Sequence, residues 1–223
     1  AVGVDALKNN TTGDYNTGLG YAALTTSTTG ERNTGIGYGA GDAITTGSYN
    51  TGVGMSAMGG LTTGNHNTAI GNEALNAASN TASGKSALQL NTTGSNNTAV
   101  GKDALYANTT GEKNTALGTF ALDANTTANN NTAVGYAALG ANTTGTENTA
   151  TGSASLQKTT TGDYNTAVGF AALHENITAD NNTAVGRFAL YANTTGTNNV
   201  AVGASTLDAN TTGGFNIGIG ATT

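Results

Sequence analysis

The chain has 223 residues, of which 34 are glycine and only 9% are charged, and it contains no proline, cysteine or tryptophan. The lack of cysteine excludes disulfides and thiolate metal sites. The net charge of −6 is spread along the chain and argues against a nucleic-acid binder, which needs a basic stripe. The sequence contains no apolar run of about 18 residues, so we expect no membrane-spanning helix.

A phrase of 17 residues recurs along the whole chain and reads NTAVGYAALGANTTGTE at 131–147. Its opening asparagine stands at residues 16, 33, 50, 67, 80, 97, 114, 131, 148, 165, 182, 199 and 216. We number the phrase positions 1–17 and predict a single repeat array over 1–223, with a partial first copy and one 13-residue copy at 67–79. Because the sequence starts in the middle of a phrase, we expect a fragment of a longer or processed chain.

Each phrase predicts a strand, a bend, a second strand and a turn, in that order. Positions 2–4 alternate β-branched and small residues, as in Thr132 to Val134. Glycine at position 5 predicts a bend, a positive φ or a close backbone approach. Positions 6–9 predict a second short extended segment that ends in leucine. The Asn-Thr-Thr-Gly of positions 12–15 is turn chemistry, with the glycine in the left-handed conformation.

These elements predict an all-β fold, a parallel β-roll or β-solenoid of 17-residue coils with two short strands per coil. A helical array is disfavoured, because no apolar stripe follows the helical period and Gly, Asn and Thr are poor helix formers. We expect the aliphatic position 4, the glycine at position 5 and the leucine at position 9 to form the repeated core. Representative core residues are Val134, Gly135, Leu139, Val185, Gly186 and Leu190.

Asparagine at position 1 is too regular for a loop residue. Identical side chains of stacked coils lie about 4.7–4.8 Å apart, so their amides can form a hydrogen-bonded ladder. We predict such a structural column, which includes Asn114, Asn131, Asn148, Asn165 and Asn182. The Asn-x-Thr triplets at position 12, such as the one at Asn142, follow from the turn chemistry, although they are also acceptor triplets for N-glycosylation.

Two large aliphatic residues per coil offer little burial for one chain. Each contributes roughly 1.5–3 kcal/mol when buried. Ordering the backbone of one coil costs on the order of 17–34 kcal/mol. We therefore expect several chains to share a core around one axis, with the small residues at positions 3, 7 and 8 allowing close approach.

The segments 131–135 and 182–186, both Asn-Thr-Ala-Val-Gly, resemble the head repeats of trimeric autotransporter adhesins of the YadA type. The longer phrase with its Ala-Asn-Thr-Thr-Gly turn is similar to repeats of phage tail fibres and other trimeric bacterial fibres. The resemblance covers the whole chain, and the 17-residue period departs from the shorter adhesin coil. It implies a left-handed parallel β-roll, three chains per fibre and a role in adhesion or receptor contact.

Aromatic residues stand only at the variable positions 6, 7, 10 and 17, where they cover coil edges or fill between chains. Exposed rings are also typical of binding surfaces for sugars or partner proteins. The candidate contact residues are Tyr15, Tyr49, Tyr106, Tyr164 and Tyr191. The two histidines, His66 and His174, have no ligand spacing, and we expect both to be solvated loop residues.

No acid, base or nucleophile set repeats or converges, so we expect no enzyme, no cofactor and no metal. We expect a structural or adhesive fibre segment, extracellular, on a cell surface or a virion tail fibre. Its partners would be two further copies of itself and a glycan or cell-surface receptor, with no nucleic acid and no membrane span. Alternatives are a self-assembling extracellular filament or a solenoid that binds ice or another flat surface through threonine pairs such as Thr109-Thr110.

Overall fold

A computed structural model describes residues 1–75 and 79–221. These residues form parallel strands joined by turns and bends, and no helix occurs among them, so the predicted all-β solenoid is confirmed. The chain divides into two compact units, Ala1–Thr110 and Gly111–Thr223, and each is described by itself. In the sequence, the 17-residue period continues through both.

Each coil contributes one strand of three residues at positions 2–4. The first unit contains β1 (Thr17–Leu19), β2 (Thr34–Ile36), β3 (Thr51–Val53), β4 (Thr68–Ile70), β5 (Thr81–Ser83) and β6 (Thr98–Val100). The second contains β7 (Thr115–Leu117), β8 (Thr132–Val134), β9 (Thr149–Thr151), β10 (Thr166–Val168), β11 (Thr183–Val185), β12 (Val200–Val202) and β13 (Ile217–Ile219).

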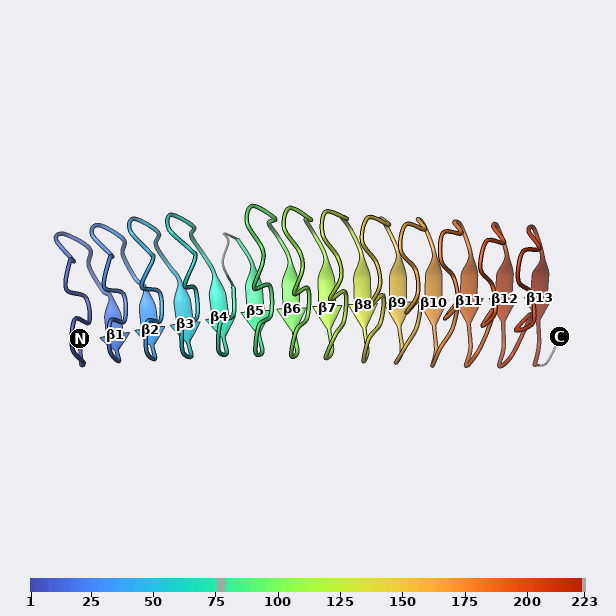
Figure 1. Cartoon of the computed structure of the whole chain (residues 1–223), viewed down its shortest axis with the longest axis horizontal. Coiled ribbons are helices and arrows are strands. Elements are labelled where there is room, and N and C mark those ends of the chain that lie inside the picture. The colour runs from blue at the N-terminus through green and yellow to red at the C-terminus, as the bar shows by residue number, and fades with distance from the viewer. Residues whose placement is uncertain (76–78, 222–223) are drawn as a thin grey trace. The chain divides into compact units, whose positions relative to one another are not determined.

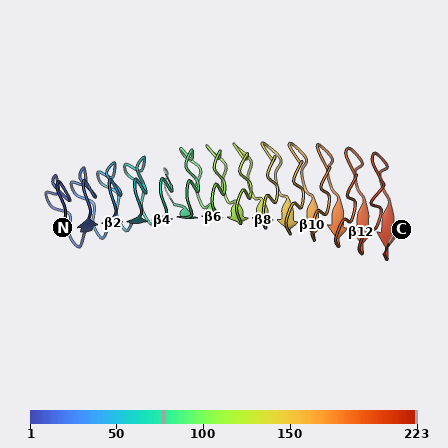
Figure 2. The same cartoon turned by 60° about the horizontal axis from the view of Figure 1, so that its bottom comes forward.

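Within each unit, strands that follow one another in the chain pair in parallel. Equivalent positions face each other, so Thr17 lies opposite Thr34 and Thr166 lies opposite Thr183. Figure 1 shows the coils of each unit following one another in chain order. Figure 2 shows that, within each unit, the strands lie along one side of the coils and the loops lie on the other.

The second strand expected at positions 6–9 does not form in the described coils. Positions 7 and 9 adopt left-handed backbone conformations instead, with φ of 51° at both Ala137 and Leu139. The Ala137 N–H donates to the Thr119 carbonyl of the preceding coil, and the Leu139 N–H donates to the Ser155 carbonyl of the following coil, both at 3.0 Å. Both neighbouring coils therefore hold this segment, although its backbone is not extended.

In most coils the interior is filled by the leucine of position 9 and the small residues of positions 3 and 8. In the coil 131–147, Ala133, Ala138 and Leu139 are completely buried, and Leu190 is equally buried in its own coil. The interior is narrow, because a Cβ added to a position-3 glycine, Gly35, would lie 2.9 Å from Cγ of Leu24. Only alanine or glycine fits opposite the leucine.

Position 4 points out of the coil, contrary to the prediction. Side chains alternate between the two faces of a strand, so an inward position 3 places positions 2 and 4 outward. Val134 is half-buried and Val185 is 37% exposed, so their assignment to the interior is wrong for the chain itself. The small residues of positions 3 and 8 line the interior of their own chain and do not form a surface for another chain.

Glycine at position 5 has the positive φ and the close backbone approach that its recurrence in every phrase predicts. Gly135 and Gly186 both have φ of 138°, in the region that favours glycine. A Cβ on Gly135 would lie 2.5 Å from the carbonyl oxygen of Gly152 in the next coil. At position 15 the prediction was wrong, because Gly145 is not left-handed, and close approach to the Gly162 carbonyl explains the glycine instead.

The asparagines of position 1 lie in the coil interior and form a ladder. Within each unit, the backbone N–H of one asparagine donates to Oδ1 of the preceding asparagine, at 3.0 Å from Asn131 to Asn114 and 2.9 Å from Asn148 to Asn131. The same bond joins Asn165 to Asn148 and Asn182 to Asn165. Side-chain amides also bond to each other, as from Asn165 Nδ2 to Asn148 Oδ1 at 3.1 Å. Every rung thus satisfies a buried backbone donor.

A second column of buried asparagines occupies position 12 in most coils. Asn142 Nδ2 donates to Asn125 Oδ1 of the preceding coil at 3.1 Å and to the Gly145 carbonyl of its own turn at 2.9 Å. Asn142 is fully buried, so its Asn-x-Thr triplet presents no accessible side chain for glycosylation in the folded chain. The coil 33–49 replaces this column with Ile44, which packs near Gly41, the glycine that stands where other coils have leucine.

The 13-residue copy keeps its strand and its rung of the ladder. Thr68 lies opposite Thr81, and the Asn80 N–H donates to Asn67 Oδ1 at 2.9 Å. The missing residues therefore belong to the segment that follows Leu75. The expected loss of part of the Asn-Thr-Thr-Gly turn falls on residues 76–78, which lie outside the described residues.

Candidate functional site

The outward face of the sheet in each unit is free of charged residues. Positions 2 and 4 of the strands carry threonine and aliphatic residues, with Ser83 as the exception, and threonine begins every strand from β1 to β11. The aliphatic column is accessible, with Leu19, Ile70 and Leu117 exposed by 46%, 45% and 47%. Contiguous apolar surface on a soluble protein is typical of an interaction site.

A ladder of stacked side chains runs along position 17 in the first unit. The guanidinium of Arg32 lies 5.0 Å from the ring centre of Tyr15 and 5.3 Å from that of Tyr49, and Tyr49 stacks on His66 at 4.9 Å. All four residues have left-handed φ values, which cost about 1–2 kcal/mol for side chains other than Asn or Gly. The ring faces inside this ladder cover one another and leave edges exposed.

The five tyrosines that the sequence suggests as contact residues do not form one site. Tyr15 and Tyr49 share the ladder of the first unit, while Tyr106 is 37% exposed at position 10. In the second unit, Tyr164 is exposed, and Tyr191 is half-buried against His174, with ring centres 5.2 Å apart.

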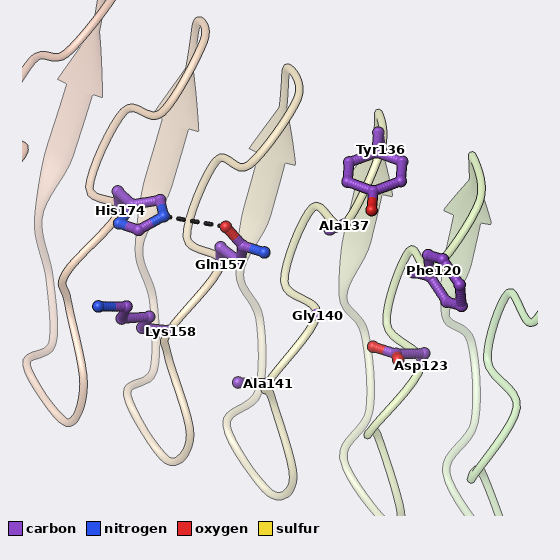
Figure 3. Close-up of a pocket in the computed structure, with 9 residues that line it drawn as sticks. All are labelled: Phe120, Asp123, Tyr136, Ala137, Gly140, Ala141, Gln157, Lys158 and His174. Atoms are coloured by element: carbon purple, nitrogen blue, oxygen red, sulfur yellow. Dashed lines mark hydrogen bonds between the residues drawn. The ribbon is translucent and has the colours of Figure 1, made fainter.

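A hollow of about 450 Å³ lies over the coil 131–147 in the second unit, as Figure 3 shows. Its floor consists of Ala137, Gly140 and Ala141. These short side chains occupy positions 7, 10 and 11. At position 10 the adjacent coils carry the larger Asp123 and Gln157, at position 7 the preceding coil carries Phe120, and at position 11 the following coil carries Lys158. Since equivalent positions stack directly on each other, one coil with small residues between larger neighbours leaves a depression.

One end of the hollow is aromatic. Phe120 and Tyr136 meet edge to face, with ring centres 5.9 Å apart and planes at 86°, and Tyr136 is 56% exposed. Asp123 stands next to them, and a Cβ on Gly140 would lie 3.4 Å from its Oδ1. The carboxylate of Asp123 therefore lies next to this part of the floor.

The opposite end of the hollow is polar, and hydrogen bonds hold its side chains in place. Lys158 Nζ bonds both carboxylate oxygens of Glu175, at 2.9 and 2.7 Å. His174 lies between Glu175 Oε1, at 2.8 Å from Nδ1, and Gln157 Oε1, at 2.9 Å from Nε2. The hydrogen bond from Lys158, followed by that from His174, holds the pKa of Glu175 below its usual value.

The prediction that His174 is a solvated loop residue is wrong, because its side chain is only 16% exposed and is bonded on both nitrogens. Sequence reasoning also missed the hollow as a whole. The signal was present in the aligned phrases, where Gly140 stands between Asp123 and Gln157 of the adjacent coils and Ala137 follows Phe120 of the preceding coil. This pattern indicates a hollow only when equivalent positions of successive coils are known to stack.

Within residues 1–75 and 79–221, no group of three histidine, cysteine, aspartate or glutamate side chains is placed to hold a metal ion. The same residues include no helix with the length and apolar character needed to cross a bilayer. Comparisons with models of protein families, with curated proteins and with solved structures give no match to this chain.

Proposed function

We propose that the chain is a non-catalytic segment of an extracellular fibre that displays binding surfaces on a cell surface or a virion. The observation that carries this proposal is the division between inside and outside. The asparagine of position 1, the small residues of positions 3 and 8 and the leucine of position 9 build the interior, and the glycine of position 5 allows the close backbone contacts, while the varied positions 6 and 17 face outward. Such an array is a scaffold on which surface residues can vary without loss of the fold.

The charge-free face of the sheet supports self-association as a homotrimer. Its occupant would be the same face of further copies, because position 4 is aliphatic in every strand except β5 (Ser83) and β9 (Thr151), and copies in register would match this column along its length. Burying this column would supply the apolar contact that a single chain leaves exposed, at about 25 cal/mol per Å². The resemblance to trimeric adhesin and tail-fibre repeats points to the same number of chains.

Light scattering on the purified chain tests this assembly. We expect a mass near three times 21.8 kDa. The double substitution Val185→Lys and Val202→Lys, on the outward face of β11 and β12, should reduce it to that of the monomer. The matched control is Thr195→Lys with Thr212→Lys, which adds the same charge at exposed position 14. A wild-type mass of 21.8 kDa would reject the trimer.

A second candidate function, binding to ice or another flat crystalline surface, is favoured by the threonine column at position 2. The threonine pair at positions 13 and 14 is a poorer candidate, because it lies in a bend and the hydroxyl of position 13 is often engaged, as in Thr143 Oγ1 to the Thr160 carbonyl at 3.0 Å. Thr166 and Thr183 instead lie in register on paired strands. An absence of thermal hysteresis in the purified chain would exclude this function.

A further inference from the structure

We propose that the hollow over the coil 131–147 binds a neutral pyranose sugar. This inference rests on the proposed adhesive function and names the chemistry of one ligand. The volume of the hollow lies within the range of ~300–1,000 Å³ that is typical of small-molecule sites. Its floor consists of small, uncharged residues. One end is aromatic and the other polar, and a sugar ring likewise has an apolar C–H face and a polar hydroxyl edge.

The aromatic end matches the C–H face of a pyranose. Tyr136 is more than half exposed, and its phenol adds a hydroxyl that donates and accepts at the rim. Phe120 contacts this ring edge to face and supports it from the preceding coil. An apolar face with a polar tip suits a ligand that alternates C–H groups and hydroxyls.

The polar end and Asp123 match the hydroxyl edge. Glu175 takes two of the three N–H donors of Lys158, which leaves one for a ligand. The Gln157 oxygen is bonded to His174, and Figure 3 shows the amide nitrogen on the side away from that histidine, toward the floor. The carboxylate of Asp123 lines the other end. Donors and acceptors thus flank one neutral floor.

The charges around the hollow favour a neutral ligand over an anion. Asp123 lies at the aromatic end, whereas the charge of Lys158 at the opposite end is neutralised by Glu175. An anion in the hollow would face the Asp123 carboxylate without an unpaired cation to offset it. A neutral polyol meets no such repulsion, because its hydroxyls both donate and accept hydrogen bonds.

An NMR titration of the full chain tests the proposal. The probes are the methyl glycosides of glucose, galactose, mannose and N-acetylglucosamine, each added to ~50 mM, well above the millimolar dissociation constant expected for a ligand of this size. We expect saturable shifts of the Gly140 and Ala141 amide signals with at least one sugar. No saturable shift with any of the four would overturn the proposal.

Two variants, each with a matched control, locate the site. Gly140→Gln fills the hollow with the side chain that stands at the same position in the next coil, and the control Gly59→Gln makes the same change in the first unit. Tyr136→Ala removes the aromatic wall, and the control Tyr21→Ala removes a ring from the same position elsewhere. We expect each hollow variant to weaken binding about tenfold or more, and each control to leave it unchanged.

Should Gly140→Gln fail to fold, Tyr136→Ala decides the question alone. Shifts of equal size in Tyr136→Ala and in Tyr21→Ala would show binding elsewhere and would overturn the proposal. The assembly is tested separately: absent sugar binding in an intact trimer rejects only the hollow, whereas sugar binding by a chain of monomeric mass rejects only self-association through the sheet face.

Discussion

Two columns of asparagine run through the interior, and they tolerate change differently. Position 1 is asparagine in every phrase, whereas position 12 also holds Ser27, Ile44, Leu61 and Thr159. Both columns are buried, and both bond the carbonyl of position 15. Only position 1 accepts a bond from a backbone N–H of the next coil. An asparagine that accepts a hydrogen bond from a buried backbone N–H cannot be replaced by an aliphatic residue. An asparagine that bonds mainly to other asparagine side chains can be.

The largest effect should follow from breaking the first column. Asn131→Leu leaves the buried N–H of Asn148 without its acceptor and forces an aliphatic side chain into the ladder. Since each buried unsatisfied group costs about 1–3 kcal/mol, we expect the free energy of unfolding to fall by about 3 kcal/mol. Denaturant unfolding measures the loss, and hydrogen exchange at the Asn148 amide should accelerate.

The same substitution in the second column of the same coil is the matched comparison. Asn142→Leu removes bonds to Asn125 Oδ1 and the Gly145 carbonyl, but that carbonyl keeps its bond from Asn131 Nδ2 at 2.8 Å. It also removes Asn142 Oδ1, a buried acceptor without a partner. We expect a change within about 1 kcal/mol. A loss equal to that of Asn131→Leu would contradict the distinction between the columns.

Repairing the second column should stabilise the chain. Asn142 Oδ1 has no partner because the next coil carries Thr159 in place of asparagine. Thr159→Asn supplies an amide donor at that point, and we expect a gain of about 1 kcal/mol in the unfolding free energy. The gain should disappear when Asn142→Leu is introduced as well, since the acceptor is then absent.

The smallest effect concerns a polar group at the surface, outside both columns. The folded chain lowers the pKa of Glu175 below its ordinary value of 4.5, through Lys158 and then His174. Its contribution to stability is therefore present above pH 4.5 and is lost as the pH falls through the lowered pKa. We expect a few tenths of a kcal/mol at most, because the pair is solvated. Thermal unfolding of Glu175→Gln should lack this part of the acid dependence.

Sequence alone predicts most of the fold and little of the candidate site. The period, the strand at position 2–4 and the close approach at Gly135 follow from residue type and spacing. Which side of the strand faces inward does not follow from the sequence, because the alternation places Thr132 and Val134 on one face without indicating whether that face is buried. Ala133 is inside since Leu139 already fills the narrow interior. The hollow depends on stacked neighbours, which no single phrase reveals.

The shortened copy at 67–79 has a consequence for the history of such a chain. Its strand and ladder rung survive the loss of four positions, and the coils on either side keep their register. Most bonds join residues one phrase apart, so copying or deleting a whole phrase in the gene preserves them. Unequal exchange between repeated DNA segments can thus lengthen or shorten the protein, and each new copy is free to acquire its own surface residues.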